Sequence, residues 1–127
     1  MEKILVEISA GELVDKITIL EIKKAKITNK KKLEDINKEL VSLNETFKKF
    51  IPDKSNIKNH MEELKNINFK LWDIEDGKRE LEKKQEFSKK FIELARNVYK
   101  FNDKRAKIKL EINKILGSNI KEVKSYE

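Results

Sequence analysis

The chain has 127 residues, a length that favours one domain with a single modest core. It contains no cysteine, which excludes both a disulfide framework and thiolate metal ligands. The net charge of +7 could indicate a nucleic-acid partner, but lysines are mixed with glutamates throughout and no aromatic residues interleave a basic run, so nucleic-acid binding is disfavoured.

The N-terminal segment predicts a short strand followed by a helix. Residues 3–8 place Ile4, Val6 and Ile8 on one side of an extended chain. Ser9 then opens a capping box, in which its hydroxyl accepts from the Glu12 amide and the Glu12 carboxylate reaches back. We therefore expect a first helix over residues 10–27.

A second helix is expected over residues 31–51, because apolar residues recur at intervals of three and four with nothing polar among them. Pro52 ends this helix. Its apolar stripe consists of Leu33, Ile36, Leu40, Leu43, Phe47 and Phe50.

Two further helices complete the expected fold. Ser55 and Asn56 can cap a third helix over residues 56–84, which contains Gly77 in its interior. After a turn near residues 85–88, a fourth helix is expected over 88–116, and Gly117 terminates it. The fold class is thus all-α, an antiparallel four-helix bundle forming one domain over residues 1–127. Residues 120–126 could add a second strand beside 3–8, giving a small two-stranded sheet.

Polar residues lie on the predicted apolar faces of three helices when each is projected at about 100° per residue. In the first helix Glu21 falls inside the apolar arc. By contrast, Glu12, Asp15 and Lys16 fall outside that arc or on its edge. The inner polar residues of the third and fourth helices are Asn68, Glu75, Arg79, Asn102, Arg105, Lys109 and Asn113.

Two interpretations of these inner polar residues stay open. A buried charge is costly unless it is paired, so the groups must pair, be hydrated or face something polar. They could form a structural polar network or a polar subunit interface, in an oligomerisation or protein-interaction module without enzymatic activity. Alternatively, they line a pocket between the first, third and fourth helices that binds a small anionic metabolite, such as a carboxylate, a phosphate or a sugar phosphate. We favour the pocket, because cations outnumber carboxylates in this set.

The pocket hypothesis assigns roles to particular residues. If a reaction occurs, Glu21 or Glu75 would act as general acid or base, and Lys109 would stabilise developing negative charge. Arg79 and Arg105 would clamp the anion through their planar guanidinium groups. Whether the protein is an enzyme stays open. The candidate ligand-binding residues are Glu21, Asn68, Trp72, Glu75, Arg79, Tyr99, Asn102, Arg105, Lys109 and Asn113.

Other classes of ligand and partner are not indicated. The lone His60 has no second histidine or cysteine with which to chelate a metal, so we expect neither a metal nor a cofactor. No apolar stretch approaches the roughly 18 residues of a membrane span, and the N-terminus lacks a signal-peptide pattern. We therefore expect a cytoplasmic protein without a membrane partner, whose partners are a small anionic molecule or further copies of itself.

Four segments of the chain resemble a family of small bacterial proteins known only as a domain of unknown function. These segments are "ILVEISAGELVDKITILEIK", "LWDIEDGKRE", "ARNVYKFNDKRAKIKLEINKILGS" and "EVKSY". The resemblance implies a mostly helical, cytoplasmic bacterial protein and supplies no activity. It also implies that the family's characteristic positions correspond here to Lys16, Glu21, Asn68, Trp72, Glu75, Asp76, Arg79, Tyr99, Asn102, Asp103, Arg105, Lys109 and Asn113. The chain departs from the family pattern at Gly77, where a better helix former is expected.

Overall fold

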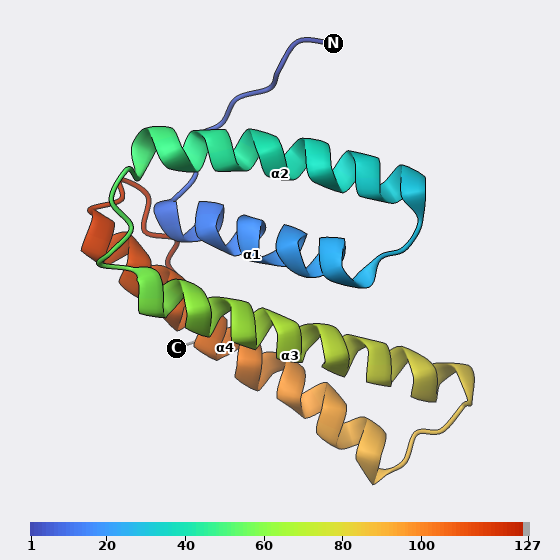
Figure 1. Ribbon diagram of the computed structural model, residues 1–127. Helices are drawn as coiled ribbons and strands as arrows, with labels where there is room; N and C mark the ends of the chain where they lie inside the picture. Colours follow the sequence, from blue (N-terminus) through green and yellow to red (C-terminus); the bar gives the residue numbers. More distant parts are fainter. Residues whose placement is uncertain (126–127) are drawn as a thin grey trace.

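The computed structural model of the protein describes residues 1–125 and contains four helices in this part of the chain (Figure 1). They are α1 (Ala10–Lys26), α2 (Lys30–Phe50), α3 (Lys58–Lys83) and α4 (Lys89–Leu116). The predicted all-α class is confirmed, and each predicted helix matches an observed one to within two residues at either end. Among residues 1–125, no helix combines the length and the apolar composition that crossing a bilayer requires.

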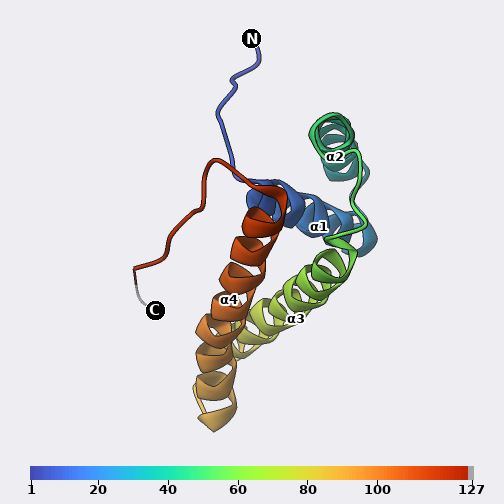
Figure 2. The same ribbon diagram turned by 90° about the vertical axis from the view of Figure 1, so that its left-hand side faces the viewer.

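Helix α1 occupies the centre of the molecule. It packs against each of the other three helices, whereas α2 packs on α1 alone among the described helices. Helices α3 and α4 pack closely against each other, and both contact α1. Figure 2 shows α1 between α2 on one side and the α3–α4 pair on the other, with the far end of that pair extending beyond α1. The packing is bundle-like, but α2 contacts neither α3 nor α4, so the four helices do not form a closed bundle.

Local sequence signals explain most of the helix ends. The Ser9 hydroxyl accepts from the Glu12 amide at 3.1 Å, as the capping box predicts, although the Glu12 carboxylate turns instead toward Lys109. Gly117 ends α4 in the left-handed conformation with φ 65°. The predicted cap of α3 at residues 55–56 is wrong, because Ile57 occupies the N-cap position and provides no side-chain hydrogen bond.

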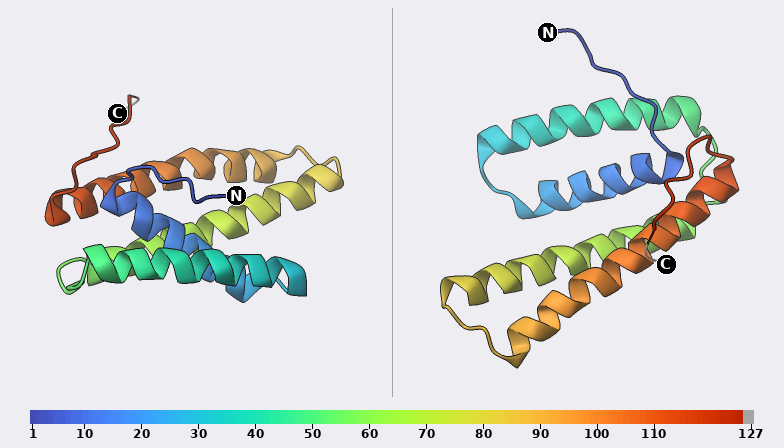
Figure 3. Two further views of the ribbon diagram at one scale, coloured as in Figure 1. Left: turned by 90° about the horizontal axis from the view of Figure 1, so that it is seen from above. Right: turned by 180° about the vertical axis from the view of Figure 1, so that it is seen from behind.

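The predicted two-stranded sheet is wrong for the described residues. Residues 1–8 form no strand and run away from the helices, as the view from behind shows (Figure 3). The C-terminal segment also forms no strand through residue 125, and Tyr126, which the prediction included, lies outside the described residues. This segment is held elsewhere, because Asn113 Nδ2 donates to the Lys121 carbonyl at 3.1 Å and the Ala10 amide donates to Ser118 Oγ at 3.1 Å.

The apolar core lies on both sides of α1. Its buried members are Leu13, Val14, Ile17, Leu20, Ile36, Leu40, Phe47, Ile51, Ile57, Leu64, Ile108 and Ile112. Most of the predicted stripe of α2 faces this core, but Phe50 at its C-terminal end is 70% exposed. The prediction for Phe50 is wrong because α2 has no second helix to pack against beyond α1. Helix α3 continues through Gly77 without a break.

Candidate functional site

A buried carboxylate, Asp15, joins three helices. Its side chain is 1% exposed and sits on α1 where α3 and α4 meet that helix. Arg105 of α4 donates from Nε to Asp15 Oδ1 at 3.0 Å and from Nη2 to Asp15 Oδ2 at 2.5 Å. Asn68 of α3 donates from Nδ2 to Asp15 Oδ1 at 2.8 Å. The bidentate pairing fixes the guanidinium plane as well as its position.

Lys109 lies one turn further along α4 and is surrounded by carboxylates. Its side chain is 8% exposed, and its Nζ lies 2.5 Å from Glu12 Oε2 and 3.6 Å from Asp15 Oδ2. Glu122, in the segment after α4, approaches the same nitrogen to 3.1 Å. We refer to Glu12, Asp15, Asn68, Arg105, Lys109 and Glu122 together as the buried ion network.

Hydrogen bonds from neighbouring side chains complete this network. Asn68 Nδ2 also lies 2.8 Å from Thr18 Oγ1, and that hydroxyl donates to the Asp15 carbonyl at 2.8 Å. Arg105 Nη1 donates to Asn102 Oδ1 at 3.2 Å. The buried carboxylate is therefore satisfied on both oxygens, as a charge in this position requires.

The electrostatics of the network favour the charged forms of Asp15, Arg105 and Lys109. Burial alone would raise the pKa of Asp15, but hydrogen bonds from Arg105 and Asn68 and the nearby positive charges outweigh burial and lower that pKa below 3.8. Burial would likewise lower the pKa of Lys109, yet the hydrogen bond to Glu12 and the charge of Asp15 raise it above 10.5. The Arg105 pKa is raised, chiefly by its hydrogen bonds to Asp15. All three groups are ionised near neutral pH.

The network contains three carboxylates and two cations, which reverses the surplus of cations that the sequence predicted for the interior. Both cations of the network are therefore paired with carboxylates of the same chain. In residues 1–125, no three histidine, cysteine, aspartate or glutamate side chains are grouped as metal ligands.

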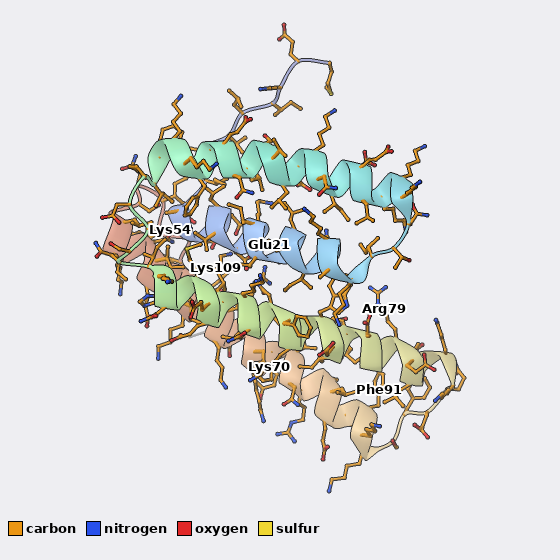
Figure 4. The ribbon with its side chains drawn as sticks, in the orientation of Figure 1. Glu21, Lys54, Lys70, Arg79, Phe91 and Lys109 are labelled. Carbon is orange, nitrogen blue, oxygen red and sulfur yellow. The ribbon has the colours of Figure 1, made fainter. Side chains whose placement is uncertain are left out.

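A cleft of about 370 Å³ opens beside Arg105 where α1, α3 and α4 meet. We call it the Trp72 cleft, and its lining residues are Ile19, Ile22, Asn68, Leu71, Trp72, Glu75, Asp76, Arg79 and Arg105. Figure 4 shows Arg79 in the C-terminal half of α3, and Lys109 between α1 and the α3–α4 pair. Glu75 Oε1 lies 3.4 Å from Lys78 Nζ, which offsets part of its charge.

Five of the ten predicted ligand-binding residues line the Trp72 cleft. They are Asn68, Trp72, Glu75, Arg79 and Arg105. Asn102 and Lys109 line a second cavity of about 300 Å³ on the other side of Arg105, together with Glu12 and Glu122.

The structure places the other three predicted residues away from the cleft. Glu21 is only partly buried and pairs with Lys65 at 3.2 Å, in a groove between α1, α2 and α3. Tyr99 is 55% exposed. Asn113 is completely buried; its Oδ1 accepts from the Gly11 amide at 2.6 Å, which joins α4 to α1, and its Nδ2 donates to the Lys121 carbonyl after α4.

Sequence reasoning missed the centre of the network, Asp15, and its partners Glu12, Thr18 and Glu122. The projection treated α1 as a helix with one buried face, but α1 is covered by α2 on one side and by α3 and α4 on the other. Its buried surface is therefore wider than a single apolar arc, and Asp15 and Thr18 lie within it. The one available signal was that Asp15 and Thr18, two short polar side chains three positions apart, lie within a segment rich in leucine, isoleucine and valine.

Helices α1 and α4 come close together at Gly11. A Cβ at this position would overlap the Lys109 carbonyl oxygen and would lie 2.9 Å from Asn113 Oδ1. Glycine therefore permits the close approach that brings Glu12 and Asp15 within reach of α4.

These features define the chain as an all-α protein whose central helix carries a buried ion network beside a small polar cleft. Within this class, the model of the DUF6165 family, described as a family of unknown function, matches residues 4–127. The chain belongs to this family, which confirms the resemblance to a domain of unknown function. The comparisons with curated proteins and with solved structures found no match.

Proposed function

We propose that this protein binds a small anionic molecule, such as a carboxylate, a phosphate or a sugar phosphate, in the Trp72 cleft. The observation that carries the proposal is that Arg79 of α3 and Arg105 of α4 line the same cleft. Two guanidinium groups from different helices can grip one oxyanion from two directions.

Arg105 suits this role because the protein already holds it in place. A guanidinium has about five N–H donors, and Asp15 and Asn102 accept from three of its nitrogen positions. Its remaining N–H groups are left for a ligand, without the entropic cost of ordering a free side chain. Arg79 forms no ion pair within the described part of the chain, so its charge is available to an incoming anion.

The rest of the cleft favours a ligand that is not purely ionic. Trp72, Leu71 and Ile22 offer an apolar wall, against which a ring or a short carbon chain can pack. Glu75 can accept from a hydroxyl or amine of the ligand. The volume of about 370 Å³ is near the lower end of ligand pockets and suits a metabolite smaller than a dinucleotide.

The positions of the three candidate catalytic residues also favour one of them. Among the three candidates Glu21, Glu75 and Lys109, Glu75 alone lines the Trp72 cleft. Lys109 is engaged by carboxylates of the buried ion network, and Glu21 lies in a different groove. If the ligand is transformed, Glu75 is the group placed to act as general acid or base.

Trp72 provides a direct test, because it is the one tryptophan of the chain and lies in the cleft. We would titrate inorganic phosphate, glucose 6-phosphate and succinate at constant ionic strength and follow the Trp72 fluorescence. The proposal expects a saturable change with at least one of these probes. Sodium chloride at matched ionic strength should give no saturable change.

Two arginine variants show whether a signal comes from the cleft. Arg79→Gln should weaken the binding of the responding probe by about tenfold or more, since a charge-assisted contact is lost. Arg96→Gln removes the same charge from an exposed position of α4 outside the cleft and should leave binding unchanged. Equal losses in both variants, or no saturable response to any of the three probes, would refute the proposal.

The alternative function, an oligomerisation module, is favoured by a different feature of the structure. That feature is the exposed apolar segment before α1, which is independent of the Trp72 cleft.

A further inference from the structure

Residues 3–8 form an extended apolar segment that the described part of the chain leaves uncovered. Ile4 is 78% exposed, Leu5 is 86% exposed and Val6 is 76% exposed. Within residues 1–125, no backbone hydrogen bond joins residues 1–8 to the rest of the chain. A β-prone segment with free amide and carbonyl groups is a template for pairing with another strand.

The sequence of this segment is complementary to itself when two copies run antiparallel. With Leu5 opposite Leu5 of the other copy, Lys3 lies opposite Glu7 and Ile4 lies opposite Val6. Opposite charges facing each other stabilise a strand pair, and apolar pairs on the other face do the same. A parallel arrangement in register would set Lys3 against Lys3 and Glu7 against Glu7, which is unfavourable.

We propose that a second copy of this chain pairs with residues 3–7 as an antiparallel strand, forming a dimer whose two-fold axis passes at Leu5. The interface is isologous, so each contact occurs twice. The backbone groups that are free in one copy become hydrogen-bonded across the strand pair.

Through residue 125, the chain's own C-terminal segment does not pair with this edge. Asn113 holds it through the Lys121 carbonyl, and Ser118 holds it to the start of α1 through the Ala10 amide. It therefore runs elsewhere, and residues 3–7 stay free for another copy.

A groove at the base of the segment gives the strand pair a surface on which to pack. The groove has a volume of about 480 Å³, and its lining includes Val6, Ile8, Leu13, Phe50 and Leu116. A two-stranded ribbon alone is marginally stable in water. The apolar face of this ribbon would continue the wall of the groove and cover Phe50, which is 70% exposed in one copy.

Charge exchange tests the pairing and its register. Lys3→Glu places a glutamate opposite Glu7, and Glu7→Lys places a lysine opposite Lys3, so each variant alone should dimerise about tenfold more weakly than the parent. An equimolar mixture of the two variants restores both opposite-charge pairs and should recover the parent's dimerisation, as should the double variant. Sedimentation velocity over a series of concentrations measures each dissociation constant.

A monomeric parent across the whole concentration range, or a mixture that dimerises no better than its components, would overturn the proposal. Lys3 and Glu7 lie outside the four described helices, so an unchanged helical circular dichroism spectrum verifies that the variants fold.

A cysteine cross-link provides a second readout of the register. Because the chain has no cysteine, Leu5→Cys introduces a single thiol on the two-fold axis, where two copies can form a disulfide under mild oxidation. Ile92→Cys is a matched control, since Ile92 is 53% exposed on α4 and far along the chain from the segment. Cross-linking at position 5 but not at position 92 is expected, and equal cross-linking at both would contradict the register.

Discussion

Asp15 and Arg105 lie 90 positions apart in the sequence and form a bidentate ion pair that joins α1 to α4. The carboxylate is 1% exposed, so it depends on this partner for its solvation. Removing one member of a buried pair leaves the other charge uncompensated, which costs far more than the net value of the pair.

Arg105→Met should therefore lower the free energy of unfolding by about 3–5 kcal/mol. Methionine keeps the bulk and the helix propensity of the position while deleting the charge. The quantity to measure is the unfolding free energy in urea. A loss below about 1 kcal/mol would place the pair among weak surface ion pairs and contradict its structural role.

Arg79→Met is the matched comparison, because Arg79 is exposed and forms no ion pair within the described residues. Its unfolding free energy should stay within about 0.5 kcal/mol of the parent's. Together with a loss of phosphate or sugar-phosphate binding, that result would show that Arg79 serves binding alone, whereas Arg105 also stabilises the fold.

Asp15→Asn should show a loss of stability that depends on pH. The folded-state pKa of Asp15 is lowered below 3.8, so its carboxylate contributes stability above the unfolded-state pKa and loses that contribution as the pH falls through the folded-state pKa. The difference between parent and variant, about 3 kcal/mol near neutral pH, should thus shrink in acid. Urea unfolding of parent and variant at a series of pH values between about 7 and 2 measures this difference in unfolding free energy. A difference that persists unchanged in strong acid would contradict the ionised pairing.

Gly11→Ala adds only one methyl group but should destabilise the fold strongly. The added methyl would overlap the Lys109 carbonyl oxygen, so α1 and α4 would have to separate. We expect a loss of about 1–3 kcal/mol in the free energy of unfolding, measured in urea.

Gly77→Ala is the control substitution, since it adds the same methyl at a helical position with room to adjust. The new Cβ would lie 3.2 Å from Leu94 Cδ1, the end of a half-buried side chain that can shift. Alanine should stabilise α3 by about 0.5–1 kcal/mol through its greater helix propensity. A destabilisation equal to that of Gly11→Ala would mean that the close approach at Gly11 is not special.

Glu122→Gln should loosen the segment after α4 without unfolding the protein. Its carboxylate lies 3.1 Å from Lys109 Nζ and is partly exposed, while Glu12 and Asp15 remain to compensate the lysine. Global stability should change by less than about 1 kcal/mol. Backbone relaxation measured by NMR should show larger motions at residues 118–125, whereas the motions of α1 should not change. Unchanged motions of these residues would show that the contacts of Asn113 and Ser118 hold the segment without Glu122.

The helices could be predicted from the sequence because their signals are local. Ser9 and Gly117 mark helix ends through their own backbone and side-chain chemistry, and the stripe of α2 follows from helical periodicity. The strand prediction for residues 3–8 was wrong because the strand pattern does not say whether a partner is present.

The buried ion network could be predicted only in part, because it depends on which helices cover α1. Arg105, Lys109 and Asn68 were found because they interrupt the apolar faces of helices that are covered on one side. Asp15 was missed because α1 is covered on two opposite sides, which a single-helix projection cannot reveal. Glu122 lies after the last helix, where no periodicity constrains its position.

The central position of α1 also has a consequence for how the chain is made. A ribosome synthesises α1 first, but two of the three helices that cover α1, α3 and α4, are synthesised last. Asp15 cannot meet Arg105 until most of the chain has emerged, since the two residues are 90 positions apart. The α3–α4 hairpin is formed by neighbours in sequence and can fold as soon as α4 is complete. Among the four described helices, α1 is therefore made first and waits longest for its last neighbours, and the side of α1 that α3 and α4 cover stays exposed to chaperones until then.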